Sequence, residues 1–117
     1  LLDRVTVTIF PDSTTILDSF NCCNRTQTFD QKGGITRFVH DGYNRLTSKT
    51  DPTGATVQQS YDALGNLLSL TDPNGHTWQW QYDALNRRIR EIDPLGNQPT
   101  WTYDAVGNIA SRTDGNG

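Results

Sequence analysis

The stretch Tyr61–Gly75, YDALGNLLSLTDPNG, recurs along the chain at a fixed interval of 21 residues. Tyr82–Gly96 reads YDALNRRIREIDPLG, and Tyr103–Gly117 reads YDAVGNIASRTDGNG. One interval earlier, His40–Gly54 reads HDGYNRLTSKTDPTG. A fixed period of about 20 to 50 residues is typical of a repeat architecture, so these copies predict a chain of equivalent, stacked units.

Two kinds of turn account for the positions that agree between copies. Asp can bond its own backbone two residues on, Pro presets φ near about −65°, and Gly adopts conformations that other residues avoid. Gly65 and Gly107, replaced by Asn44 and Asn86 in other copies, predict a site of positive φ, which Gly and Asn tolerate. The repeat-defining residues are Tyr61, Asp62, Gly65, Asn66, Asp72, Pro73, Gly75, Tyr82, Asp83, Asp93, Pro94, Gly96, Tyr103, Asp104, Gly107, Asn108, Asp51, Pro52 and Gly54.

The period divides the chain into six units. Residues 1–18 form a degenerate partial repeat, and residues 19–39 form a degenerate repeat. Three full repeats of the Tyr-Asp (YD) type follow at 40–60, 61–81 and 82–102, and residues 103–117 form a truncated YD repeat. In the unit 19–39 we expect Ser19-Phe20 to stand in place of the Tyr-Asp pair. Because the chain opens inside a strand-like segment and stops just after a turn, we expect it to be a piece of a longer protein.

The sequence pattern of each full unit predicts two strands, and no segment shows a helical period. The best copy places them at Asn66–Thr71 and His76–Tyr82, and earlier strands are expected at Val5–Ile9 and Thr14–Phe20. Equivalent returning strands are expected over residues 34–40, 55–61 and 97–103. The prediction is an all-β fold, a repetitive antiparallel β-hairpin strip with turns at 51–54, 72–75 and 93–96.

The returning strands alternate, with Trp78, Trp80 and Tyr82 on one face. Stacking the units places two rows of side chains across the sheet. One row is Phe38, Gln59, Trp80 and Trp101, and the other is His40, Tyr61, Tyr82 and Tyr103. Aromatic rows can hold sugar rings, so Trp78, Trp80 and Trp101 are candidates for contact with a glycan, but cross-strand stacking is the favoured interpretation.

At these residues the chain resembles the Rhs/YD-repeat family, whose unit Tyr-Asp-x-x-Gly-Asn … Thr-Asp-Pro-x-Gly it matches over about Ser19–Gly117. That family includes bacterial polymorphic toxins, shell components of insecticidal toxin complexes and the extracellular part of teneurins. The resemblance implies a YD-repeat shell segment, in which a hairpin strip spirals into a hollow wall around a C-terminal toxin. It also implies further YD repeats as partners and a secreted or cell-surface location.

Composition and charge limit the other functions. Apolar residues make up 33% of the chain, too few for a thick two-layer core. A net charge of −3 gives no reason to expect nucleic acid, and no apolar run approaches the roughly 18 residues of a membrane span. Cys22 and Cys23, the only cysteines, are expected to be free thiols at a degenerate turn.

No enzyme is predicted, and no cofactor or metal. The repeated aspartates lie where turns need a backbone cap, and His40 and His76 have no nucleophile in a recognisable motif. The sequence favours a structural segment that encloses or displays another polypeptide, for example a toxin domain. Two alternatives stay open: a self-assembling extracellular filament or tube of YD repeats, and a carbohydrate-binding surface. An isolated monomer is not expected, because uncovered sheet edges recruit further strands.

Overall fold

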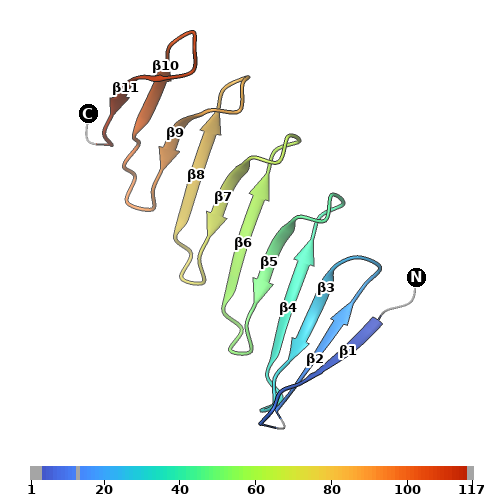
Figure 1. The fold of residues 1–117 in the computed structure, drawn as a ribbon. Coiled ribbons are helices and arrows are strands. Elements are labelled where there is room, and N and C mark those ends of the chain that lie inside the picture. Colours follow the sequence, from blue (N-terminus) through green and yellow to red (C-terminus); the bar gives the residue numbers. More distant parts are fainter. Residues whose placement is uncertain (1–3, 13, 116–117) are drawn as a thin grey trace. The chain divides into compact units, whose positions relative to one another are not determined.

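The computed structural model describes residues 4–12 and 14–115, and among these it contains strands and no helix. The strands follow one another across the sheet in chain order, and neighbours run antiparallel (Figure 1). This confirms the all-β hairpin strip. The eleven strands are β1 (Arg4–Ile9), β2 (Thr15–Phe20), β3 (Arg25–Phe29), β4 (Ile35–His40), β5 (Leu46–Thr50), β6 (Thr56–Tyr61), β7 (Leu67–Thr71), β8 (Thr77–Tyr82), β9 (Arg88–Ile92), β10 (Thr100–Tyr103) and β11 (Ile109–Thr113).

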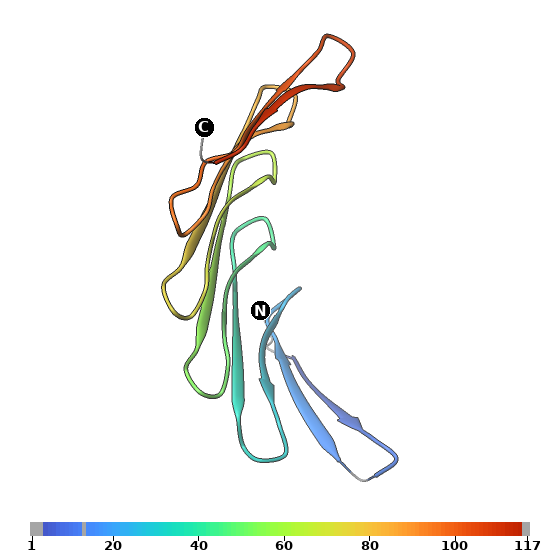
Figure 2. The ribbon, with the colours of Figure 1, turned by 90° about the vertical axis from the view of Figure 1, so that its left-hand side faces the viewer.

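The chain forms two compact units, residues 1–58 and residues 59–117. The first unit holds β1 to β5 with the start of β6, and the second holds the end of β6 with β7 to β11. In both units the chain reverses at alternate ends of the strands (Figures 1 and 2). The part of the chain that the structure describes has no helix that could span a membrane.

The two faces of the strands differ in burial as the alternation predicts. In β8, Trp78, Trp80 and Tyr82 are half-buried, whereas Gln79 and Gln81 are exposed. We call the side with the tryptophans the aromatic face and the other side the polar face. No hydrophobic side chain of the described residues is fully buried. The stability of each unit therefore comes from hydrogen-bonded hairpins and cross-strand contacts, since a single layer has no enclosed core.

A β-bulge recurs in the repeats. Between β8 and β9, Gln81 pairs with Arg90 but Tyr82 pairs with Arg88, so Ile89 is the extra residue. The same shift occurs one repeat later between β10 and β11, and two repeats earlier between β4 and β5. A bulge strengthens the local twist of a strand and shifts its facing by one residue. The sequence pattern did not predict this feature.

The strand expected over residues 97–103 is shorter than predicted, and β10 begins only at Thr100. Pro99 accepts a hydrogen bond from the N–H of Glu91 at 3.1 Å. It has no N–H with which to donate, so the ladder with β9 cannot continue through it. The other strands expected in the repeats are present, with boundaries within one residue of the prediction.

The prediction that Ser19-Phe20 replaces the Tyr-Asp pair is wrong by one residue. Phe20 pairs with Arg25 across a bulge in the way that Tyr82 pairs with Arg88. Asn21 then takes the place of the aspartate, and its Oδ1 accepts the N–H of Asn24 at 3.0 Å. The loop between β2 and β3 is one residue shorter than the loop between β8 and β9, which shifts the register of the earlier residues.

Candidate functional site: the repeated turn and the aromatic face

One turn geometry occurs eight times between residues 30 and 108. In the turn at Asp62, the aspartate N–H donates to the carbonyl of Asn66 at 3.0 Å, and the N–H of Gly65 donates to the carbonyl of Asp62 at 3.2 Å. This is a three-residue hairpin loop that ends on a left-handed residue. The left-handed residues have φ between 62° and 94°, and they are Gly33, Asn44, Gly54, Gly65, Gly75, Asn86, Gly96 and Gly107.

The positive φ predicted for Gly65, Gly107, Asn44 and Asn86 is thereby confirmed. The two turns that looked different in sequence, Tyr-Asp-x-x-Gly and Asp-Pro-x-Gly, are the same turn. In each, the aspartate comes first and the left-handed residue follows three positions later. The shared spacing was present in the sequence, and it could have identified the equivalence.

The aspartate carboxylates organise these turns. Oδ1 of Asp62 accepts the N–H groups of Leu64 and Asn66, both at 2.9 Å, and Oδ2 accepts the side-chain amide of Asn66 at 2.8 Å. The hydrogen bond from the Asn66 side chain is the main reason that the pKa of Asp62 is lowered. A carboxylate that is stabilised in this way is ionised at neutral pH and has no proton to donate as a general acid. The same lowering of the pKa applies to Asp41, Asp51, Asp72, Asp83, Asp93 and Asp104.

Side chains at the Tyr-Asp turns also link neighbouring repeats. In the second unit, Nδ2 of Asn66 donates to Oδ1 of Asn86 in the next repeat at 3.0 Å. The guanidinium of Arg87 lies 4.5 Å from the centre of the Tyr103 ring. At these turns Gly65-Asn66 and Gly107-Asn108 alternate with Asn86-Arg87. Each asparagine at a left-handed position thus faces an asparagine of the preceding repeat, an arrangement also seen in the first unit, where Asn24 bonds Asn44 at 2.7 Å.

The tyrosine of the repeat bonds the backbone of the repeat before it. The Tyr82 hydroxyl donates to the carbonyl of Leu67 at 3.0 Å, and the Tyr103 hydroxyl donates to that of Arg88 at 2.6 Å. Partial burial raises the pKa of Tyr82, so its hydroxyl stays protonated and able to donate. The Tyr61 hydroxyl donates to the side chain of Gln59 at 2.9 Å. These contacts explain why tyrosine recurs at this position of the repeat, since phenylalanine would leave the carbonyls without this donor.

The tryptophans named as candidates for glycan contact lie on the aromatic face of the second unit. Nε1 of Trp80 donates to Glu91 at 3.1 Å, and Arg88 donates to the same carboxylate oxygen at 3.2 Å. The guanidinium of Arg88 also lies 4.7 Å from the ring centre of Trp101. Arg112 lies on the same ring at 5.9 Å.

These contacts use the aromatic face for cross-strand packing. Trp78 is half-buried opposite Leu70 on the neighbouring strand. Contact of the three tryptophans with a glycan stays a prediction that no finding supports.

The two histidines lie in different local settings. Nδ1 of His76 lies 2.9 Å from Oδ2 of Asp72 within a turn, and His40 pairs with Leu46 across a bulge. Within residues 4–12 and 14–115, no group of three or more His, Cys, Asp or Glu side chains is placed to hold a metal ion.

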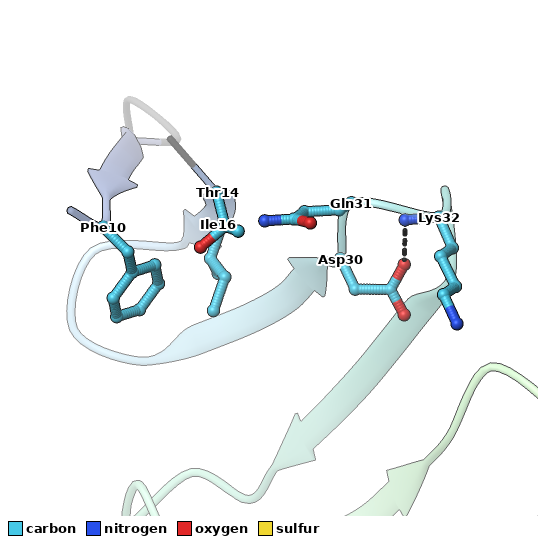
Figure 3. A pocket seen from close by; sticks show the side chains of 6 residues that line it. All are labelled: Phe10, Thr14, Ile16, Asp30, Gln31 and Lys32. Atoms are coloured by element: carbon cyan, nitrogen blue, oxygen red, sulfur yellow. Dashed lines mark hydrogen bonds between the residues drawn. The ribbon is translucent and has the colours of Figure 1, made fainter. Parts of the chain in front are cut away.

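A hollow of about 380 Å³ lies in the first unit, between the turn that joins β1 to β2 and the turn that joins β3 to β4 (Figure 3). Its walls are Phe10, Thr14, Ile16, Asp30, Gln31 and Lys32. Oδ1 of Asp30 is occupied by the N–H of Lys32 at 2.8 Å and that of Gly34 at 2.8 Å. The carboxylate therefore serves the turn, and the hollow is a gap between two neighbouring hairpin ends.

Exposed apolar residues recur at the tips of the Tyr-Asp turns. Leu64, Leu85 and Val106 in the second unit, and Tyr43 in the first, are between 71% and 82% exposed. We call these four residues the apolar tips. All four stand at the same position of a Tyr-Asp turn, and a single exposed apolar residue at a turn tip is ordinary. The sequence showed the apolar position but not its exposure.

The comparisons with known proteins agree with this architecture. A family model described as RHS Repeat matches residues 61–98. A mutant of the Photorhabdus luminescens Tc holotoxin pore matches 90% of this chain with 23% identity and a TM-score of 0.65. The crystal structure of TcdB2-TccC3-TEV matches 90% with 22% identity and a TM-score of 0.67. That of TcdB2-TccC3 without its hypervariable C-terminal region matches 97% with 18% identity and a TM-score of 0.65.

This chain spans only 6% of the first two matched chains and 7% of the third. At these identities the likeness shows a shared fold. No curated protein matches the sequence significantly.

Proposed function

We propose that this chain, which the RHS Repeat model matches over residues 61–98, is a segment of the wall of an RHS-type shell. Its function is structural, namely to enclose or display another polypeptide. The observation that carries this proposal is the set of bonds that each repeat makes with the one before it. The Tyr82 and Tyr103 hydroxyls and the Asn66–Asn86 pair tie successive hairpins into one continuous strip.

The surfaces of the strip support a wall over an isolated sheet. The aromatic face is only half-buried, and the apolar tips are exposed. A second layer of protein against them would cover both. An RHS-type shell supplies such a layer from one long chain.

The proposed occupant is a polypeptide, for example a toxin domain. One matched structure is that of TcdB2-TccC3 without a hypervariable C-terminal region, and another is that of a holotoxin pore. In this proposal the present chain contributes wall and not cargo, because carboxylates such as Asp62 and the His76–Asp72 pair make their bonds within turns. We place the parent protein outside the cell or at its surface.

Electron microscopy of the full-length native protein tests the proposal. The expected result is a closed, hollow particle built from one long chain, within which a C-terminal segment resists added protease until the wall is unfolded. An extended polymer would instead support a filament of the same repeats. A particle without a lumen, or a C-terminal segment that is digested as fast as a free peptide, would refute the wall function.

A further inference from the structure

The cysteines of the chain lie side by side at the end of one hairpin. Cys22 and Cys23 are the two central residues of the loop Asn21–Asn24, and both are exposed. Their sulfur atoms are 3.0 Å apart. Asparagines close the loop: the N–H of Asn21 donates to the carbonyl of Asn24 at 3.0 Å, and the N–H of Asn24 donates to Oδ1 of Asn21 at 3.0 Å. The backbone is therefore held without help from the thiols, and the Cys23 thiol donates a hydrogen bond to the sulfur of Cys22.

We propose that Cys22 and Cys23 form a reversible thiol–disulfide site whose substrate is a small-molecule disulfide. In the first step, one cysteine thiolate attacks a sulfur of the small disulfide, forming a mixed disulfide and releasing one thiolate. In the second, the neighbouring thiolate attacks the protein sulfur of the mixed disulfide, forming the Cys22–Cys23 bond and releasing the other thiolate. The two cysteines lose two electrons and two protons in total, and the small disulfide gains them as two thiols.

The distance between the sulfur atoms makes the second step fast. A group held next to its target reacts as though it were present at very high concentration, so the neighbouring thiolate outcompetes any thiol in solution. At 3.0 Å the two sulfur atoms are nearly in contact before any bond forms. The mixed disulfide is therefore short-lived, and this behaviour separates the pair from two independent surface thiols.

The geometry of adjacent residues makes the bond easy to reduce again. Neighbouring Cα atoms are about 3.8 Å apart across a trans peptide, whereas protein disulfides usually span about 4.4–6.8 Å. The strain in such a ring favours reduction. A ring that joins adjacent residues also removes little conformational freedom from the unfolded chain, so it stabilises the fold hardly at all. The pair is thus suited to a reversible switch and not to a structural crosslink.

The loop is also connected to the next repeat. Asn24, directly after Cys23, donates through Nδ2 to Oδ1 of Asn44 at 2.7 Å. Closing the ring changes the backbone that positions Asn24, so oxidation loosens this link. Amide exchange at the turn that contains Asn44 should then be faster in the oxidised protein than in the reduced one.

The test uses the full-length protein in buffers of oxidised and reduced glutathione, followed by alkylation of free thiols and mass analysis of the peptide that contains both cysteines. The wild-type peptide should convert to an internal disulfide without accumulating a glutathione adduct. Cys22→Ser and Cys23→Ser should each accumulate that adduct instead. As a second probe, phenylarsine oxide forms two sulfur–arsenic bonds with loss of water, and each single variant should bind it at least tenfold more weakly.

The double variant Cys22→Ser/Cys23→Ser is the control for folding, and its strands β2 and β3 should keep their amide protection. The inference is overturned if the wild type accumulates the adduct as the single variants do. It is also overturned if the wild type stays reduced in a buffer that modifies the single variants, or if none of the proteins is modified at all.

Discussion

Replacing Gly65 with alanine separates the cost of a left-handed backbone from the cost of crowding. Gly65 has φ of 94°, and a Cβ atom added there would meet no other atom within 4 Å. The whole penalty of Gly65→Ala therefore comes from the conformation of the backbone. For a residue with a Cβ atom this conformation costs about 1–2 kcal/mol.

Gly42 offers a matched control in a neighbouring repeat. A Cβ atom added at Gly42 would also meet nothing within 4 Å, but its φ is not positive. Gly42→Ala should therefore be neutral, or should stabilise its hairpin by about 0.4–1 kcal/mol through the unfolded chain. Gly65→Asn should cost less than Gly65→Ala, because Asn44 and Asn86 already occupy the equivalent position with φ of 64° and 62°.

Amide hydrogen exchange of the full-length protein measures these differences hairpin by hairpin. A loss of about 1–2 kcal/mol corresponds to exchange that is roughly 5- to 30-fold faster in the hairpin of Gly65. Exchange in the hairpin of Gly42 should not accelerate in its own variant. Equal acceleration by Gly65→Ala and Gly42→Ala, or none by Gly65→Ala, would show that the left-handed turn is not what the glycine supplies.

Three further outcomes follow from the same contacts. Tyr82→Phe removes the hydroxyl that bonds Leu67, so the free energy of unfolding should fall by about 0.5–1.5 kcal/mol in denaturant titration, and an unchanged midpoint would contradict the contact. The lowered pKa of Asp62 stabilises the fold fully above the ordinary pKa of 3.8, and this stability is lost as the pH falls through the lowered pKa. Asp62→Asn should therefore flatten the curve of unfolding free energy against pH in acid. An unchanged slope would contradict a stabilising role of the Asp62 carboxylate. Asn86→Gly should be more favourable in an Asn66→Ala background than in the wild type, with a coupling of about 0.5–1.5 kcal/mol in a double-mutant cycle, whereas strict additivity would exclude the asparagine link.

The sequence alone was enough to predict the turns of the well-preserved repeats and most of the strands between them. A turn such as Asp62–Asn66 is closed by hydrogen bonds within five residues, so its requirements are written into adjacent positions of the chain. The positive φ at Gly65 follows from the same local rule, because the alternation of Gly and Asn at one repeat position has few other physical causes. The sequence also predicted which face of the sheet each strand side chain occupies, since side chains alternate between the two faces with period two.

Contacts between repeats were decided only by the tertiary structure. The Tyr82 hydroxyl reaches the carbonyl of Leu67, fifteen residues back, and Asn66 reaches Asn86, twenty residues on. Such partners depend on the register of the strands, and a slip of one residue turns every side chain to the opposite face. The bulge at Ile89 is a shift of this kind, as is the single missing residue that moved the tyrosine position to Phe20. A repeating sequence therefore specifies each hairpin locally. The strand register is set only when the hairpins pair, and it determines which residues of neighbouring repeats contact each other.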